Sequence, residues 1–185
     1  MSLTPSTSIP LGFNAPEFSL TDVISKQQKS YHTIKGTKAT VVMFICNHCP
    51  FVVHVQEQLV KLANDYQSKG IGFVAISSND VVAYPQDSPE KMVEFAANLS
   101  LPFAYLFDET QEVAQAYDAA CTPDFSVFDG DDLCVYRGEL DGSRPGNGIA
   151  CDGKSMRSVL DLLIANKTVP VEGQRPSVGC NIKWK

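Results

Sequence analysis

The residues with the clearest capacity for chemistry are two cysteines in the segment FICNHCPFV, residues 44–52. Cys46 and Cys49 are separated by Asn47 and His48. Two thiols at this spacing can close as a disulfide and open again when a thiolate attacks one of the sulfurs. Structural zinc sites use the same spacing, so the pair by itself leaves redox chemistry, metal binding and inert burial open.

The elements predicted around the pair favour redox chemistry. Residues 39–45 (ATVVMFI) form an apolar run typical of a strand covered on both faces, and apolar residues recur at helical spacing over 52–66. A helix N-terminus presents unpaired N–H groups and partial positive charge, which favour a thiolate. The pattern predicts Cys46 as the attacking thiolate and Cys49, one helical turn along, as the resolving thiol. A protonated His48 would add positive charge nearby.

The remaining pattern predicts an α/β fold. A β-hairpin is expected in residues 11–36, before the strand that leads to the cysteines. Strands separated by helices imply a mixed central sheet with helices on both faces, here with an additional helix–strand insertion. The further strands are expected at 71–77, 103–108, 124–129 and 133–140, and the further helices at 88–99, 109–120 and 154–166.

Length, charge and cysteine content limit the class of protein. The chain of 185 residues suits one domain spanning 1–185, with an irregular tail at 170–185 packed on it. A net charge of −6 argues against nucleic acid or an anionic membrane as the main partner. We expect a cytoplasmic protein, since the N-terminus MSLTPSTSIP lacks a signal-peptide pattern. Six cysteines in a chain of this length are too few for a disulfide scaffold.

Six stretches together point to a known family: GFNAPEFSL, FICNHCPFV, YPQDSPEKM, DETQEVAQAYDAACTPDFSVFD, YRGELD and PSVGCNIKWK. They resemble the redoxin branch of the thioredoxin superfamily, the AhpC/TSA and TlpA-like group, and within it thioredoxin-family proteins with a CNHC motif. The resemblance covers nearly the whole chain. It implies a thioredoxin-like fold, a redox-active disulfide between Cys46 and Cys49, and a cis-proline at Pro123, preceded by Thr122, that faces the pair and helps to hold an extended substrate segment.

The expected function is that of a thiol–disulfide oxidoreductase acting on a protein or small-molecule disulfide or thiol. Thioredoxin, glutathione or a reductase would supply electrons, with no bound cofactor and no metal. The chain departs from thioredoxin at Thr40 and Ile45, which replace a buried acid and a tryptophan. A histidine before the second cysteine, His48, resembles the more oxidising members and predicts a couple less reducing than thioredoxin.

Two other functions stay open at this point. A peroxiredoxin-like thiol peroxidase, an antioxidant protein, would share the fold. Its motif P-x-x-x-[ST]-x-x-C fits neither cysteine, because the motif positions are Val42 and Cys46 in one frame and Ala39 and Met43 in the other. A redox-inert or zinc-holding binding module is the second alternative, with further zinc ligands sought among Cys121, Cys134, Cys151, Cys180 and His54.

The cysteines outside the pair have weaker signals. Cys121, directly before Thr122 and Pro123, is a candidate third redox thiol, although such a cysteine more often packs in the core. Cys180, in the tail, is either a resolving partner or an exposed thiol. The segment GIACDGKS (148–155) matches the phosphate-loop pattern, but its context favours a helix start capped by Asp152.

Overall fold

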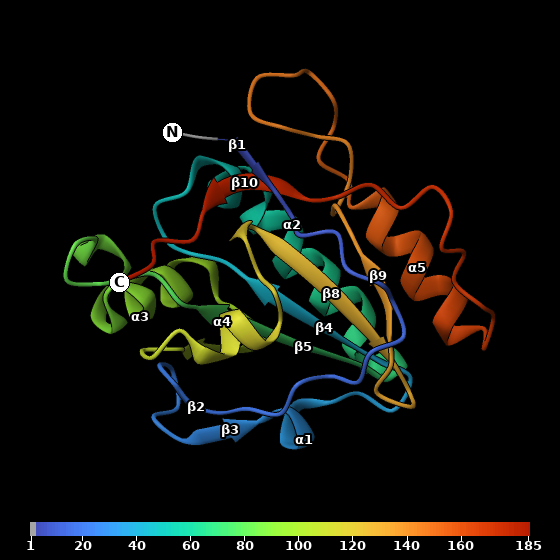
Figure 1. Cartoon of the computed structure of the whole chain (residues 1–185), viewed down its shortest axis with the longest axis horizontal. Coiled ribbons are helices and arrows are strands. Elements are labelled where there is room, and N and C mark those ends of the chain that lie inside the picture. The colour runs from blue at the N-terminus through green and yellow to red at the C-terminus, as the bar shows by residue number, and fades with distance from the viewer. Residues whose placement is uncertain (1–2) are drawn as a thin grey trace.

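The computed structural model describes residues 3–185, and the first two residues of the N-terminal segment lie outside it (Figure 1). Its strands are β1 Leu3–Pro5, β2 Ser19–Asp22, β3 Gln28–Ser30, β4 Ala39–Phe44, β5 Ile71–Ser77, β6 Ala104–Phe107, β7 Cys121–Thr122, β8 Asp124–Asp129, β9 Cys134–Arg137 and β10 Val178–Asn181. Its helices are α1 Tyr31–Ile34, α2 Pro50–Tyr66, α3 Pro89–Leu99, α4 Glu112–Ala116 and α5 Lys154–Ile164, with short 3₁₀ turns at Gln67–Lys69 and Pro85–Asp87.

The expected mixed central sheet with helices on both faces is confirmed. Its seven strands have the order β3-β2-β6-β5-β4-β8-β9. The central strands β4, β5 and β6 are parallel, and β8, β9, β2 and β3 add antiparallel neighbours. The N-terminal hairpin is β2–β3, and α3 with β6 forms the predicted helix–strand insertion.

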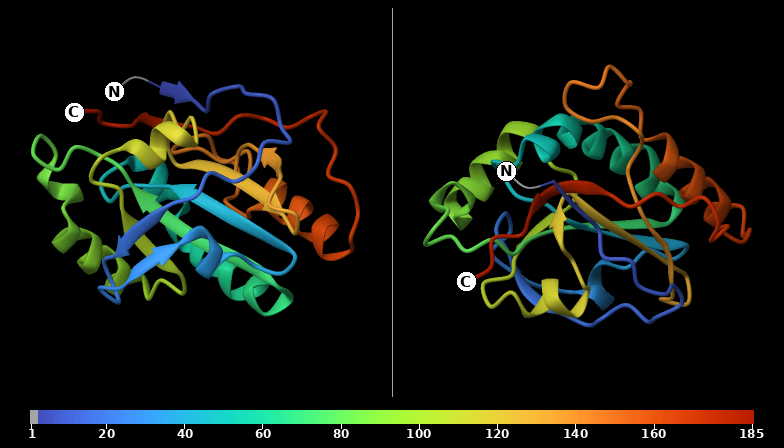
Figure 2. Two further views of the ribbon diagram at one scale, coloured as in Figure 1. Left: turned by 60° about the horizontal axis from the view of Figure 1, so that its bottom comes forward. Right: turned by 45° about the horizontal axis from the view of Figure 1, so that its top comes forward.

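Two apolar cores lie on the two faces of this sheet, because alternate residues of β4 point in opposite directions. Val41 and Met43 face a core that includes side chains of α2, α3 and α5. Val42 and Phe44 face a second core with Tyr31 of α1 and residues of α4. The helices α2 and α5 therefore lie on the opposite side of the sheet from α4 (Figure 2). Burial on both faces explains why β4 reads as one continuous apolar run.

The C-terminal segment is more ordered than the sequence suggested. Instead of an irregular tail throughout 170–185, it contains β10, which lies between β1 and β7 in a second, three-stranded sheet. These partners are far apart in the sequence, so no local pattern reveals the pairing. The side chain of Ile182 is buried in the second core, whereas the side chain of Trp184 is 43% exposed. The N- and C-terminal segments run side by side across the molecule (Figures 1 and 2).

Two further findings concern the helices. The residue that caps α5 is Gly153 and not Asp152, although the Asp152 carboxylate does accept a hydrogen bond from the Lys154 amide. The buried Asp141 also helps to fix this helix start, because its carboxylate accepts the Gly153 amide. Among the helices of the described residues, none combines the length and apolar character needed to cross a bilayer.

Candidate active site

The cysteine pair lies in the short turn that connects β4 to α2. The structure corrects one detail of the prediction: Cys49, rather than Cys46, is the N-cap of α2, and the helix itself begins at Pro50. Proline is favoured at this first helical position because its fixed φ suits the helix and its missing N–H leaves no donor unpaired. Cys46 therefore lies three residues before the helix cap, and Cys49 is not one turn into the helix. Both cysteines are buried.

Thr122 lies against both sulfurs. Its hydroxyl Oγ1 is 3.4 Å from Cys46 Sγ, and its carbonyl oxygen accepts a hydrogen bond from Cys49 Sγ at 3.1 Å. The peptide bond between Thr122 and Pro123 is cis, which confirms the expectation for Pro123. Thr122 of β7, the residue before the cis-proline, is thus the residue that contacts both cysteines of the pair.

Cys180 is the third cysteine that the structure brings to this point. Its sulfur lies 3.0 Å from Cys49 Sγ, and the residue is 2% exposed, so the exposed-thiol interpretation is wrong. Cys121 is also buried, but its thiol donates to the Pro123 carbonyl at 3.6 Å. Of the two candidate third thiols, Cys180 is therefore the one whose sulfur contacts a sulfur of the pair.

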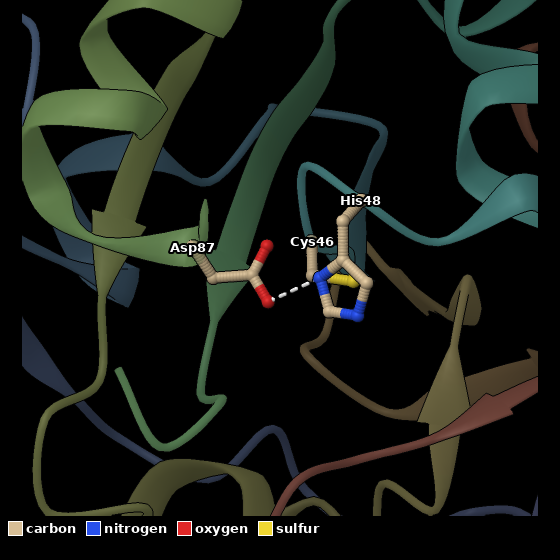
Figure 3. Close-up of side chains that lie close together, drawn as sticks. All are labelled: Cys46, His48 and Asp87. Atoms are coloured by element: carbon tan, nitrogen blue, oxygen red, sulfur yellow. Dashed lines mark ion pairs between the residues drawn. The ribbon is translucent and has the colours of Figure 1, made fainter. Parts of the chain in front are cut away.

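A histidine–carboxylate pair borders the site. His48 Nδ1 lies 2.7 Å from the carboxylate of Asp87, and Figure 3 shows the Cys46 sulfur beside the same imidazole ring. The Asp87 side chain is completely buried, where a charge requires several partners. It accepts hydrogen bonds from the Asn47 amide at 2.9 Å and from the Asn79 side chain at 2.8 Å. The ring of Tyr84 stacks on His48 at a centroid distance of 5.9 Å.

Asp87 has no sequence signal that links it to the cysteine pair. It follows Cys46 by about forty positions and ends the 3₁₀ turn Pro85–Asp87. The segment YPQDSPEKM contributed to the family resemblance, but no spacing rule connects its aspartate with the cysteines. The turn that carries Asp87 also contacts Asn47, because the Asn47 side chain donates a hydrogen bond to the Gln86 carbonyl. The same side chain accepts a hydrogen bond from the Tyr105 hydroxyl of β6.

The pKa values of the two thiols shift in opposite directions. The pKa of Cys49 falls well below its ordinary value, first because of its interaction with the Cys46 thiol and then because of its interactions with Cys180 and Thr122. The pKa of Cys46 rises, because of the same interaction with Cys49, because it is buried and because Asp87 is near. The opposite shifts favour loss of a proton from Cys49 over Cys46, whereas the sequence led us to expect the thiolate on Cys46.

Of the other candidate zinc ligands, Cys180 contacts Cys49, but within residues 3–185 no group of three close metal-binding atoms includes it. Instead, ligand atoms of Cys46, His48 and Asp87 lie within 4.8 Å of one another. His54 is engaged elsewhere, with Nε2 3.0 Å from the Ser143 hydroxyl. Cys134 is buried in β9, on the face of the second core.

A cavity of about 670 Å³ lies away from the cysteines, between α5 and the segment 169–175, and Tyr136 and Ile149 contribute to its lining. At the turn that carries the pair, both cysteines are buried, whereas Asn47 and His48 between them are half-buried. These two residues are therefore the part of the turn that a partner can contact directly.

Comparison with solved structures establishes the class of fold. The chain matches a conserved protein of uncharacterised function from Geobacillus kaustophilus at 59% identity and a TM-score of 0.98, covering 100% of this chain and 97% of that one. A hypothetical protein from Sinorhizobium meliloti matches at 42% identity and a TM-score of 0.95, covering 98% of each chain. The thioredoxin domain of a thiol-disulfide oxidoreductase from Bacteroides vulgatus matches at 17% identity and a TM-score of 0.63, covering 83% of this chain and 99% of that domain. The fold is therefore thioredoxin-like.

The family follows from the sequence match. Residues 11–137 match the AhpC/TSA family, and the chain belongs to it. This region includes Cys46, Cys49 and Pro123, whereas Cys180 lies beyond it. No curated protein matches the chain. The resemblance to the redoxins is thus confirmed, and the chain is related to oxidoreductases at the level of family and fold.

Proposed function

We propose that the protein is a thiol–disulfide oxidoreductase that exchanges a Cys46–Cys49 disulfide with substrate thiols. One observation carries this proposal: two thiols are buried together at the start of α2, where Thr122 contacts both sulfurs. A thiol pair at this position can form and break a disulfide with little movement of the backbone. The membership in the AhpC/TSA family and the thioredoxin-like fold support a redox role.

The cycle begins with the reduced pair. The Cys46 sulfur attacks one sulfur of the substrate disulfide, and its proton passes to Cys49, whose lowered pKa provides the acceptor. The substrate S–S bond breaks, a mixed disulfide forms on Cys46, and the first substrate thiolate leaves and takes up a proton. Cys49 then attacks Cys46 Sγ, so that the Cys46–Cys49 bond forms and the second substrate thiol departs.

His48, which lies beside Cys46, contributes charge next to the attacking sulfur. When His48 is protonated, the buried Asp87 carboxylate holds it next to Cys46. The positive charge stabilises thiolates that develop on Cys46 or on the leaving substrate. Together with the lowered pKa of Cys49, this charge stabilises the reduced state and makes the couple more oxidising than thioredoxin, for which the potential is about −270 mV. Thioredoxin, glutathione or a reductase would regenerate the dithiol, and the reverse, oxidising direction uses the same steps.

Trapping the mixed disulfide tests the proposal. Reduced Cys49→Ser protein treated with glutathione disulfide is expected to carry one glutathione on Cys46, identified by peptide mass spectrometry. Cys46→Ser should lose the reduction of model disulfides. Cys134→Ser, a buried cysteine away from the pair, is the control and should retain activity. Glutathione on another cysteine of the Cys49→Ser variant, or full activity of Cys46→Ser, would contradict the assignment.

Peroxidase activity is the second candidate, favoured by the AhpC/TSA match. The motif threonine is absent, but the Thr122 hydroxyl lies 3.4 Å from Cys46 Sγ and offers a hydrogen bond to a bound peroxide. Turnover of hydrogen peroxide by the wild type, compared with Cys46→Ser and Cys49→Ser, measures this activity. Turnover that is no faster than that of a free thiol rejects it.

Zinc retention is the third candidate, favoured by the proximity of Cys46, His48 and Asp87. Thiolate, imidazole and carboxylate are all ordinary zinc ligands. Metal analysis of the purified protein and thiol counting before and after dithiothreitol decide between the two roles. Stoichiometric zinc that leaves the pair unreactive toward disulfides would replace the oxidoreductase proposal.

A further inference from the structure

Cys49 lies between two other sulfurs. Its Sγ is 3.0 Å from Cys180 Sγ, and Thr122 contacts both its sulfur and that of Cys46. We propose that Cys180 is a third redox thiol, which attacks the Cys46–Cys49 disulfide at Cys49 and replaces it with a Cys49–Cys180 disulfide. The inference rests on the proposed function, because the first disulfide comes from the substrate. The family match ends at residue 137, so it assigns no role to this cysteine.

The C-terminal strand β10 positions Cys180. In the antiparallel pairing of β10 with β7, Cys180 lies directly opposite Thr122, the residue that contacts both sulfurs of the pair. Strand pairing fixes the position of the Cys180 main chain, so its side chain does not need to search for Cys49. The other edge of β10 pairs with β1, with Leu3 opposite Cys180.

A glycine makes this close approach possible. A Cβ at Gly179 would lie only 1.9 Å from the Thr122 carbonyl oxygen, far inside van der Waals contact. Only a residue without a side chain therefore allows β10 to come this near to Thr122 and Pro123. Gly179 thus allows β10 to lie against Thr122, and the strand in turn places the Cys180 sulfur next to Cys49.

Burial sets the reactivity of the third thiol. Cys180 is 2% exposed, and its pKa is raised to about 12, first by burial and then by its hydrogen bond to Cys49. It therefore stays protonated at neutral pH and is protected from oxidants in solution. Its attack on Cys49 requires loss of the proton as the Cys46 thiolate leaves, so the second exchange should be slower than the first.

The exchange balances without an additional oxidant. The Cys180 sulfur attacks Cys49 Sγ, the Cys49–Cys180 bond forms, and the Cys46–Cys49 bond breaks. The electron pair of the broken bond remains on the Cys46 sulfur, which takes up the proton released by Cys180. One disulfide and one thiol are present before and after the step.

The product differs in what it offers to a partner. Cys46 is again a thiol at the half-buried turn, but Cys49 is bonded to β10 and cannot resolve a mixed disulfide. The chain would therefore have two oxidised forms. In one, Cys46 is closed in the disulfide with Cys49; in the other, the Cys46 thiol can attack a second disulfide compound, which releases one thiol and leaves a mixed disulfide on Cys46 that Cys49 cannot resolve.

Disulfide mapping in variants that each lack one cysteine tests the inference. Each reduced protein is oxidised at low concentration with a small-molecule oxidant such as diamide, quenched with acid and an alkylating agent, digested, and examined by mass spectrometry for linked peptides. Cys46→Ser is expected to form Cys49–Cys180 in most molecules, and Cys180→Ser is expected to form Cys46–Cys49. Cys121→Ser is the matched control, because Cys121 is equally buried and lies opposite Asn181 on the same strand pair.

The outcomes separate this inference from the proposed function. If Cys46→Ser yields no Cys49–Cys180 link, or if it links Cys49 to Cys121, the role of Cys180 is rejected, and a Cys46–Cys49 link in Cys180→Ser still supports the pair. If Cys180→Ser forms no Cys46–Cys49 link, the proposed function itself fails. Circular dichroism of each variant confirms folding, and Cys180→Ala provides a second substitution if the serine variant does not fold.

Discussion

At the scale of single residues, the buried carboxylate of Asp87 is a positioning group for His48. It accepts hydrogen bonds from Asn47 and Asn79 and forms an ion pair with the imidazole. A carboxylate held in this way orients the imidazole, and it acts on Cys46 through that histidine. Its effect should therefore appear in the rate of disulfide exchange more clearly than in substrate binding.

We predict that Asp87→Asn lowers the rate of disulfide reduction at neutral pH by about tenfold, the equivalent of about 1.4 kcal/mol. The asparagine has the same shape but lacks the negative charge that lies 2.7 Å from His48 Nδ1, so the imidazole should be held less firmly beside Cys46. Rates measured across pH for both proteins provide the test. Glu94→Gln removes one negative charge from the exposed surface of α3 and is the control. An unchanged profile for Asp87→Asn would assign the residue a purely structural role.

We also predict that the reduced protein carries one thiolate at neutral pH. The pKa of Cys49 is lowered in the fold, so its ionisation stabilises the native state fully above the unfolded thiol pKa. This contribution decreases as the pH falls toward the native pKa. Thiolate absorbance in the ultraviolet should therefore titrate below pH 7 in the wild type and lose this step in Cys49→Ser. A step retained in Cys49→Ser would place the charge on another sulfur.

At the scale of elements, the approach of β10 to β7 depends on Gly179. We predict that Gly179→Ala destabilises the reduced protein by about 2 kcal/mol or more, because overpacking against main-chain atoms forces the strands apart. Denaturant unfolding measures the change. Gly142→Ala is the matched control, because a Cβ there would meet only the end of the Ile149 side chain at 3.9 Å. Equal stability of the two variants would show that β10 adjusts without cost.

The elements also show where sequence reasoning succeeds. The run ATVVMFI and the helical spacing after it located β4 and α2, because both elements have a strong local pattern. β10 could not be found in this way. It has four residues, and it pairs with β7, about sixty positions earlier in the chain, and with β1, more than one hundred positions earlier. The role of Asp87 could not be predicted for the same reason, because this residue lies next to His48 only in the folded structure.

At the scale of the whole molecule, the C-terminal segment is connected to the active site through Asn79. The Asn79 side chain accepts a hydrogen bond from the Lys183 amide at 2.9 Å and donates to the Asp87 carboxylate at 2.8 Å. The Lys183 carbonyl accepts from the Asp80 amide and from the side chain of Gln111. The last residues thus hold the loop that carries Asp87, and through it His48.

We predict that deletion of residues 183–185 loosens this loop without removing Cys180 or the buried Ile182. Amide hydrogen exchange in residues 79–87 should accelerate by about tenfold, the loss expected for roughly 1.4 kcal/mol of hydrogen bonding. Disulfide reduction should slow in parallel, because Asp87 would hold His48 less firmly. Trp184→Ser is the control: it removes an exposed side chain and leaves the main-chain contacts of Lys183 and Lys185 in place. If the truncated protein exchanges and reacts like the wild type, the connection through Asn79 has no influence on the site.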